Sequence, residues 1–347
     1  MSGTKEIQTG SKAARTALRR AARYAIASTV TAGVLLSVAG FAPAAQAATA
    51  HAAASSSAKT TARIQALLDS PAGGTVNLPH GTFTIRPTLR LQHGERIVGH
   101  GTTLRVASGS GNYSAVLAGA TASTDLSGLA ITGVTFDQNA TGNAIRNSAK
   151  LVNGKPRFVV LVGSGTGIKI TNDKFIGSDN INTIVTGGGT RDVTISGNVF
   201  KTSDALLHDH STIYTSGTST VISNNTLIGR AAYHCAAIEV HGDQGRVTGN
   251  HVRGYYRGAN LAASDTMFKG NHLSGTANPV DLWSADPGPL SNVAVTGNVL
   301  NRNLPYWRHV LAHYGVHLPP AKYLRQVIRD TTSTMPFHNI TIHGNRG

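Results

Sequence analysis

A short motif ending in asparagine recurs along the chain at nearly constant intervals. Six clear copies are 193–198 (VTISGN), 221–225 (VISNN), 247–250 (VTGN), 268–271 (FKGN), 295–298 (VTGN) and 342–345 (IHGN), and two degenerate copies precede them, 131–134 (ITGV) and 170–173 (ITND). The last residue advances by 39, 25, 27, 25, 21, 27 and 47 positions from copy to copy. A period near 25 with longer insertions predicts a solenoid, in which coils stack on one another.

The residues between the motifs indicate which kind of solenoid this is. Each unit holds two or three short alternating stretches rich in Val, Ile and Thr, separated by Gly and Asn, and no Leu-rich frame or helical spacing occurs. The chain has 39 Gly and only 14% charged residues, which excludes a helical bundle. We therefore expect an all-β coil of three short strands and three turns.

The asparagines are interpreted as structural residues. The turn after each Val/Ile stretch needs a residue that tolerates left-handed backbone geometry, as Asn and Gly do. Asparagine side chains that stack in register can form a ladder of hydrogen bonds.

With this repeat, the chain resembles the right-handed parallel β-helix proteins of the pectate-lyase-like superfamily. The resemblance covers roughly residues 60–347 and includes an amino-terminal signature at 64–83 and 96–101. It implies about ten coils, with a short helix that caps the first coil; Ile64, Leu67 and Leu68 have the spacing of one apolar helix face. The superfamily includes lyases, hydrolases, epimerases and non-catalytic proteins.

The amino-terminal segment is expected to be a signal peptide. Residues 1–47 contain a basic region, an apolar run and a final Ala-Gln-Ala, which is typical of a cleaved secretory signal; an uncleaved membrane anchor is the alternative. Residues 48–58 are expected to be a disordered lead-in, and 59–347 the β-helix domain. We expect a secreted monomer without a membrane span, and the sequence contains no nucleic-acid motif.

The charge indicates which class of polymer the chain could bind, and the cysteine content limits its disulfides and metal sites. The formal charge is +15, and removing the signal, which carries a net +5, leaves about +10, which favours polyanions such as uronate polysaccharides; a solubilising excess of basic residues is the alternative. Cys235 is the single cysteine, so an intramolecular disulfide and a cysteine-based zinc site are excluded.

The resemblance places a substrate groove on the outer face of one strand per coil. Alternation sends Ile184, Ile213, Ile238, Ala259 and Val280 inward. The outward row is then Val185, Tyr214, Glu239, Asn260 and Asp281, and the next outward column holds Ser216, His241 and Trp283.

Glu239 and Asp281 are the expected catalytic carboxylates. They stand two coils apart, so their backbones should be separated by about 9 to 10 Å. This suits the acid and base of inverting glycoside hydrolysis, or two ligands of a Ca²⁺ that bridges to a uronate. A solvated row of polar residues is the alternative.

The loops that enter the groove strands carry further candidates. Arg257 could neutralise a uronate carboxylate, and Tyr256 or His208 could move a proton or contact the sugar. Together with His241, Tyr214, Asn260 and Trp283, these residues make up the predicted site. His208 and His210 alone are too few ligands for a metal, so no metal site is assigned.

The spacing between 298 and 345 contains an insertion at 302–335, which either walls the groove or caps the last coil. Two stretches in it have helical spacing, the first with Tyr306, Val310 and Leu311 and the second with Leu324, Val327 and Ile328. The predicted function is β-elimination on an acidic extracellular polysaccharide. Glycoside hydrolysis by Glu239 and Asp281, and glycan binding without catalysis, are the alternatives. The Arg-x-Pro-x-x-Arg of calcium-dependent pectate lyases and the Asp-Asp of polygalacturonases are absent, and 99–101 (GHG) reads as a turn.

Overall fold

The computed structural model describes residues 44–69, 74–111, 113–143, 157–178, 182–201, 210–229, 235–284, 289–313, 328–330 and 337–347. Residues 48–347 form one structural unit by their internal contacts. Among the described residues, no helix is long and apolar enough to cross a membrane.

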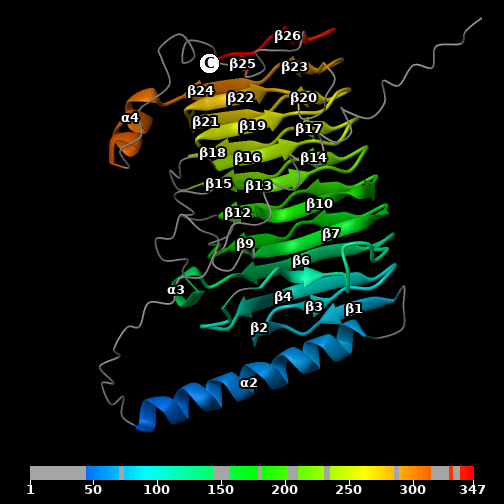
Figure 1. The fold of residues 1–347 in the computed structure, drawn as a ribbon, viewed down its shortest axis with the longest axis vertical. Helices are drawn as coiled ribbons and strands as arrows, with labels where there is room; N and C mark the ends of the chain where they lie inside the picture. Colours follow the sequence, from blue (N-terminus) through cyan, green and yellow to red (C-terminus); the bar gives the residue numbers. More distant parts are fainter. Residues whose placement is uncertain are drawn as a thin grey trace, which may run out of the picture. The chain divides into compact units, whose positions relative to one another are not determined.

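The unit is a parallel β-helix, whose strands stack in order from β1 to β26 (Figure 1). One sheet, which we call the groove sheet, has nine strands. They are β3 (Leu89–Arg90), β5 (Ala115–Ala118), β7 (Phe158–Thr166), β10 (Asn182–Arg191), β13 (His210–Thr215), β16 (Cys235–Val240), β19 (Arg257–Leu261), β22 (Asn278–Leu282) and β25 (Ile328–Asp330). About eight turns are formed, slightly fewer than the ten expected.

The second sheet has 17 strands and supplies the other two strands of each coil. They are β1 (Thr75–Leu78), β2 (Gly81–Ile85), β4 (Arg96–Val106), β6 (Ala130–Asp137), β8 (Lys169–Thr171), β9 (Lys174–Ile176), β11 (Thr194–Ser196), β12 (Val199–Lys201), β14 (Val221–Ser223), β15 (Thr226–Ile228), β17 (Arg246–Thr248), β18 (His251–Arg253), β20 (Met267–Lys269), β21 (His272–Thr276), β23 (Ala294–Thr296), β24 (Val299–Arg302) and β26 (Thr341–His343).

The core is a set of apolar rows that run through the coils. Equivalent strands place equivalent side chains above one another, so Phe136, Phe175 and Phe200 stack with ring centroids 5.2 and 4.7 Å apart. Ile184, Ile213, Ile238, Ala259 and Val280 form another fully buried row. The inward direction predicted for these five residues is confirmed.

The asparagine ladder is also confirmed. Asn250 Oδ1 accepts hydrogen bonds from the backbone N–H and the Nδ2 of Asn225, both at 3.0 Å, and Asn250 Nδ2 donates to the Ile222 carbonyl at 2.9 Å. The same pattern links 198 to 225, 250 to 271, 271 to 298 and 298 to 345. The preceding residue takes the left-handed conformation, as in Asn224 (φ 55°) and Gly249 (φ 64°).

The amino-terminal helix α2 (Ala44–Leu68) covers the first coil but is longer than predicted. Ile64 and Leu68 are buried in the core, while Thr61 Oγ1 and Gln65 Oε1 accept hydrogen bonds from the backbone N–H groups of Arg86 and Arg90, both at 2.7 Å. Residues 48–58, expected to be a disordered lead-in, are helical instead, since this stretch is rich in alanine, the strongest helix former. The predicted signal peptide lies almost entirely outside the described residues and remains a prediction.

The carboxy-terminal insertion is partly helical. Helix α4 (Leu304–His313) follows β24, and Figure 1 shows it at the side of the stack, beside β21 and β24. The second helical stretch was predicted to include Ile328, but Ile328–Asp330 forms strand β25, which pairs with β22 and extends the groove sheet. β25 thereby covers the edge that β22 would otherwise leave unpaired.

Candidate functional site

The groove sheet aligns the predicted outer row of residues. Val185 pairs with Tyr214, Tyr214 with Glu239, Glu239 with Asn260, and Asn260 with Asp281. The register predicted from the repeat is therefore correct along the five strands from β10 to β22. The row is less open than predicted, however, since Asn260 and Asp281 are 3% and 2% exposed.

Glu239 and His241 form the centre of the candidate site. His241 directly follows β16, and its Nε2 lies 2.8 Å from Glu239 Oε1; Ser211 Oγ of β13 donates to the other carboxylate oxygen. Both side chains are about 15% exposed. Burial alone would raise the pKa of Glu239, but the hydrogen bonds from His241 and Ser211 and the charges of His241 and Arg257 outweigh it and hold the pKa below its ordinary value. Glu239 is thus a carboxylate at neutral pH.

Two aromatic side chains flank His241. The ring of Tyr214, one coil before, and that of Trp283, two coils after, have centroids 4.8 and 5.1 Å from the imidazole. Trp283 meets the imidazole edge-on, at an interplanar angle of 83°. All three rings are partly exposed, and together they offer an aromatic surface with a polar centre, which is the composition that suits a sugar.

Asp281 has a cation beside it. Arg257 Nε lies 3.2 Å from Asp281 Oδ2, and the side chains are 20% and 3% exposed. The ion pair keeps the negative charge of this buried carboxylate compensated. Glu239 and Asp281 each have a partner of their own, and Arg257 lies close enough to influence both.

Buried amide atoms beside this ion pair lack hydrogen-bond partners among the described residues. Asn278 is 1% exposed, and neither its Oδ1 nor its Nδ2 has a hydrogen bond; the same holds for Oδ1 of Asn260. Buried amides are normally paired, so each such atom costs about 1–3 kcal/mol. Buried hydrogen-bonding atoms that make no bond within the described fold therefore lie around Arg257 and Asp281.

The remaining predicted residues lie elsewhere. Tyr256, expected to contact substrate, is 3% exposed and packs against Trp307 of α4, with ring centroids 5.4 Å apart. Trp307 Nε1 also donates to the Gly275 carbonyl at 2.9 Å. Helix α4 therefore covers the segments that enter β19 and β22, which favours the predicted wall beside the groove sheet over a cap on the last coil. His208 lies outside the described residues.

Ser211 and Asn278 were missed from the sequence. The predicted outward residues are those at and after Tyr214 and Asp281, but β13 and β22 begin earlier, at His210 and Asn278. The column in which Ser211, Ala236, Arg257 and Asn278 pair in turn lies two positions before the inward row, so strict alternation directs it inward and no periodic signal identifies it as part of the site.

The residues do not fit a calcium ion shared by Glu239 and Asp281. A guanidinium already neutralises Asp281, and Glu239 is engaged by His241 and Ser211. Calcium sites need several uncommitted oxygen ligands. Within the described part of the chain, no three His, Cys, Asp or Glu side chains gather into a possible metal site.

No protein-family model matches the chain, and no curated protein matches it significantly. Solved structures do match. A mutant tailspike protein of Escherichia coli bacteriophage HK620, in complex with a pentasaccharide, superposes with a TM-score of 0.60 at 18% identity, over 69% of this chain and 46% of the tailspike. The A-module of a mannuronan C-5 epimerase from Azotobacter vinelandii gives a TM-score of 0.53 at 17% identity, over 70% of this chain and 74% of the module. The chain matches less than half of the tailspike's length. At these identities the likenesses establish the fold, and this chain is a right-handed parallel β-helix.

Proposed function

We propose that the protein is a secreted member of the pectate-lyase-like superfamily and cleaves an acidic extracellular polysaccharide by β-elimination. The observation that carries this proposal is the Glu239–His241 pair between Tyr214 and Trp283. A histidine oriented by a carboxylate is suited to take a proton, because the carboxylate fixes the tautomer and stabilises the imidazolium that forms.

In the proposed reaction, His241 removes the C5 proton of a uronate residue. With Nε2–H directed to Glu239, Nδ1 carries the lone pair that accepts this proton. The electrons of the C5–H bond form the C4–C5 double bond, the C4–O bond breaks, and the departing sugar oxygen takes a proton from the phenol of Tyr214, whose ring lies beside the imidazole. Arg257 supplies positive charge that lowers the cost of the developing negative charge on the uronate carboxylate.

The structural neighbours support a glycan substrate. The tailspike was solved with an oligosaccharide, and the epimerase acts on mannuronan, a polyuronate. Epimerisation at C5 also begins with loss of the C5 proton, so it shares its first step with β-elimination. The net positive charge expected after signal removal agrees with an acidic substrate.

Hydrolysis by Glu239 and Asp281 has weaker support. An inverting hydrolase needs one carboxyl group with a raised pKa as the acid. The pKa of Glu239 is lowered, and Asp281 is buried in an ion pair with Arg257.

Incubation with a panel of acidic and neutral polysaccharides distinguishes the candidates. Ultraviolet absorbance from unsaturated products is expected with an acidic polysaccharide. New reducing ends without this absorbance would replace the lyase by a hydrolase, and retention on the polysaccharide without any cleavage would indicate a binding protein.

A further inference from the structure

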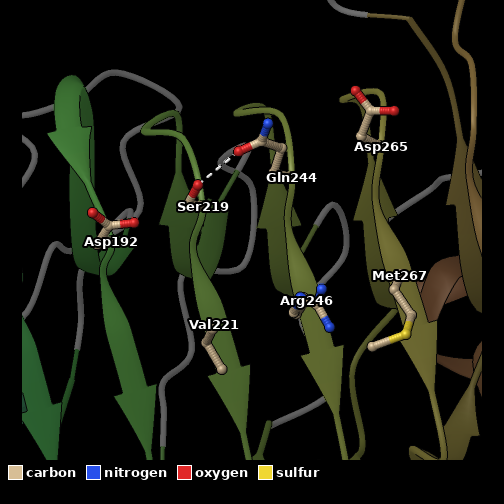
Figure 2. Close-up of a pocket in the computed structure, with 7 residues that line it drawn as sticks. All are labelled: Asp192, Ser219, Val221, Gln244, Arg246, Asp265 and Met267. Carbon is tan, nitrogen blue, oxygen red and sulfur yellow. Dashed lines mark hydrogen bonds between the residues drawn. The ribbon is translucent and has the colours of Figure 1, made fainter.

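A pocket lies on the 17-stranded sheet rather than on the groove sheet. Its volume is about 530 Å³, and it is lined by Asp192, Ser219, Val221, Gln244, Arg246, Asp265 and Met267 (Figure 2). None of these residues belongs to the site around His241. We call it the turn pocket.

The turn pocket is built from equivalent positions of successive coils. Asp192, Ser219, Gln244 and Asp265 each occupy the same left-handed turn, with φ between 55° and 62°, and each donates its backbone N–H to the next coil. Val221, Arg246 and Met267 pair with one another as the first residues of β14, β17 and β20. Because coils repeat every ~4.8 Å, polar groups recur along the pocket at about the length of one sugar residue in an extended chain.

Donors and acceptors are mixed along the turn pocket. Ser219 Oγ donates to Gln244 Oε1 at 2.7 Å, which leaves the amide nitrogen of Gln244 as a donor (Figure 2). Asn292 Nδ2 donates to Asp265 Oδ1 at 2.8 Å and holds that carboxylate in place. Asp192 supplies a second carboxylate. The guanidinium of Arg246 lies between the coil of Asp192 and the coil of Asp265.

This composition favours a neutral saccharide over a charged one. Sugar hydroxyls donate and accept, so they match carboxylates, an amide and a guanidinium at once, while Val221 and Met267 offer apolar surface to the C–H face of the ring. Two carboxylates against one guanidinium disfavour a polyanion, even though the chain as a whole is basic.

We propose that the turn pocket is a second carbohydrate site, which binds a neutral saccharide chain along the direction of coil stacking. It goes beyond the proposed chemistry at His241, because its residues take no part in that site. Such a site would hold the protein on a neutral polymer while the groove acts on an acidic one.

The proposal is tested with the full chain by calorimetry and by electrophoresis in gels that contain polysaccharide. The probes are cellopentaose, laminaripentaose and mannopentaose, with polygalacturonate and a chitosan oligomer as charged comparisons. The variants Gln244→Gly, which keeps the left-handed turn unstrained, and Arg246→Gln are compared with two controls. Lys269→Gln makes the same charge change on an exposed residue of the same sheet outside the pocket, and Trp283→Ala alters the other site.

At least one neutral probe is expected to bind, with affinity reduced about tenfold or more by both pocket variants and unchanged in both controls. Failure of all three neutral probes to bind at millimolar concentration would overturn the proposal. So would binding of a neutral probe that is lost in Trp283→Ala but kept in the pocket variants, or binding of a charged probe that the pocket variants weaken more than that of any neutral probe. The proposed lyase activity can fail without affecting this result, since no readout here depends on cleavage.

Discussion

His241 and Glu239, two positions apart, meet on one side of a single chain segment, with the imidazole Nε2 2.8 Å from the carboxylate Oε1. Side chains at i and i+2 of a strand share a face, so this contact follows from local backbone geometry and needs no long-range rearrangement. The pair is therefore formed before substrate arrives.

Replacing Glu239 by glutamine tests the importance of this pair. Glu239→Gln keeps the shape of the side chain but removes the charge that stabilises an imidazolium, so turnover should fall at least ~100-fold, with little change in melting temperature. Unsaturated product formation on the identified substrate measures the effect. Turnover equal to that of the unmodified protein would move the active site elsewhere.

Arg257 provides a test of the acidic substrate. Arg257→Lys keeps the charge but loses the planar guanidinium that grips carboxylates through paired hydrogen bonds, so turnover should fall about tenfold or more. Affinity for an acidic polysaccharide should also fall steeply between low and moderate salt, because the attraction is electrostatic. A preference for a neutral polysaccharide that is insensitive to salt would sink the lyase proposal.

The asparagine ladder predicts a stability effect. Asn250→Leu removes the side-chain acceptor of Asn225 and the donor to Ile222, and should cost about 1–3 kcal/mol in the free energy of unfolding. Asn224→Gly is the matched control, because glycine occupies the same left-handed position in the next coil. Denaturant unfolding of both variants decides the matter, and equal stability would contradict the ladder's role.

Asp173 predicts a pH dependence of stability. It occupies the ladder position before Asn198, and burial raises its pKa from 3.8 to about 8, although the N–H groups of Val134 and Thr171 act in the opposite direction. The unfolded chain releases this proton near pH 4 and the folded one near pH 8, so stability should decrease as pH rises between these values. Asp173→Asn should remove the decrease and raise the melting temperature at pH 8, whereas Asp192→Asn, at an exposed turn, should not. If the melting temperatures of Asp173→Asn and of the unmodified protein change in the same way from pH 5 to 8, the expected ionisation of Asp173 is contradicted.

The repeat made the fold and its register predictable, because one error of register would have turned every side chain of a strand to the wrong face. The pairing of Tyr214 with Glu239 and of Asn260 with Asp281 could be read from the sequence for that reason. The burial of residues in the outer row could not be read from the sequence. Asp281 and Tyr256 are both buried, and the contact of Tyr256 with Trp307, which comes from a later insertion, leaves no periodic signal.

The ladder of asparagines has a direction, which bears on how such a chain can change its length. The Oδ1 of each ladder asparagine accepts hydrogen bonds from the preceding coil, and its backbone N–H and Nδ2 donate to the Oδ1 of the asparagine in the following coil. Any coil can therefore follow any other without a special junction. Duplicating the 25 residues 174–198, which lie before the site, should lengthen the stack by one coil and leave the neighbours of His241 in place. The same interchangeability lets a gene for this fold gain or lose whole coils while its chemistry stays where it was.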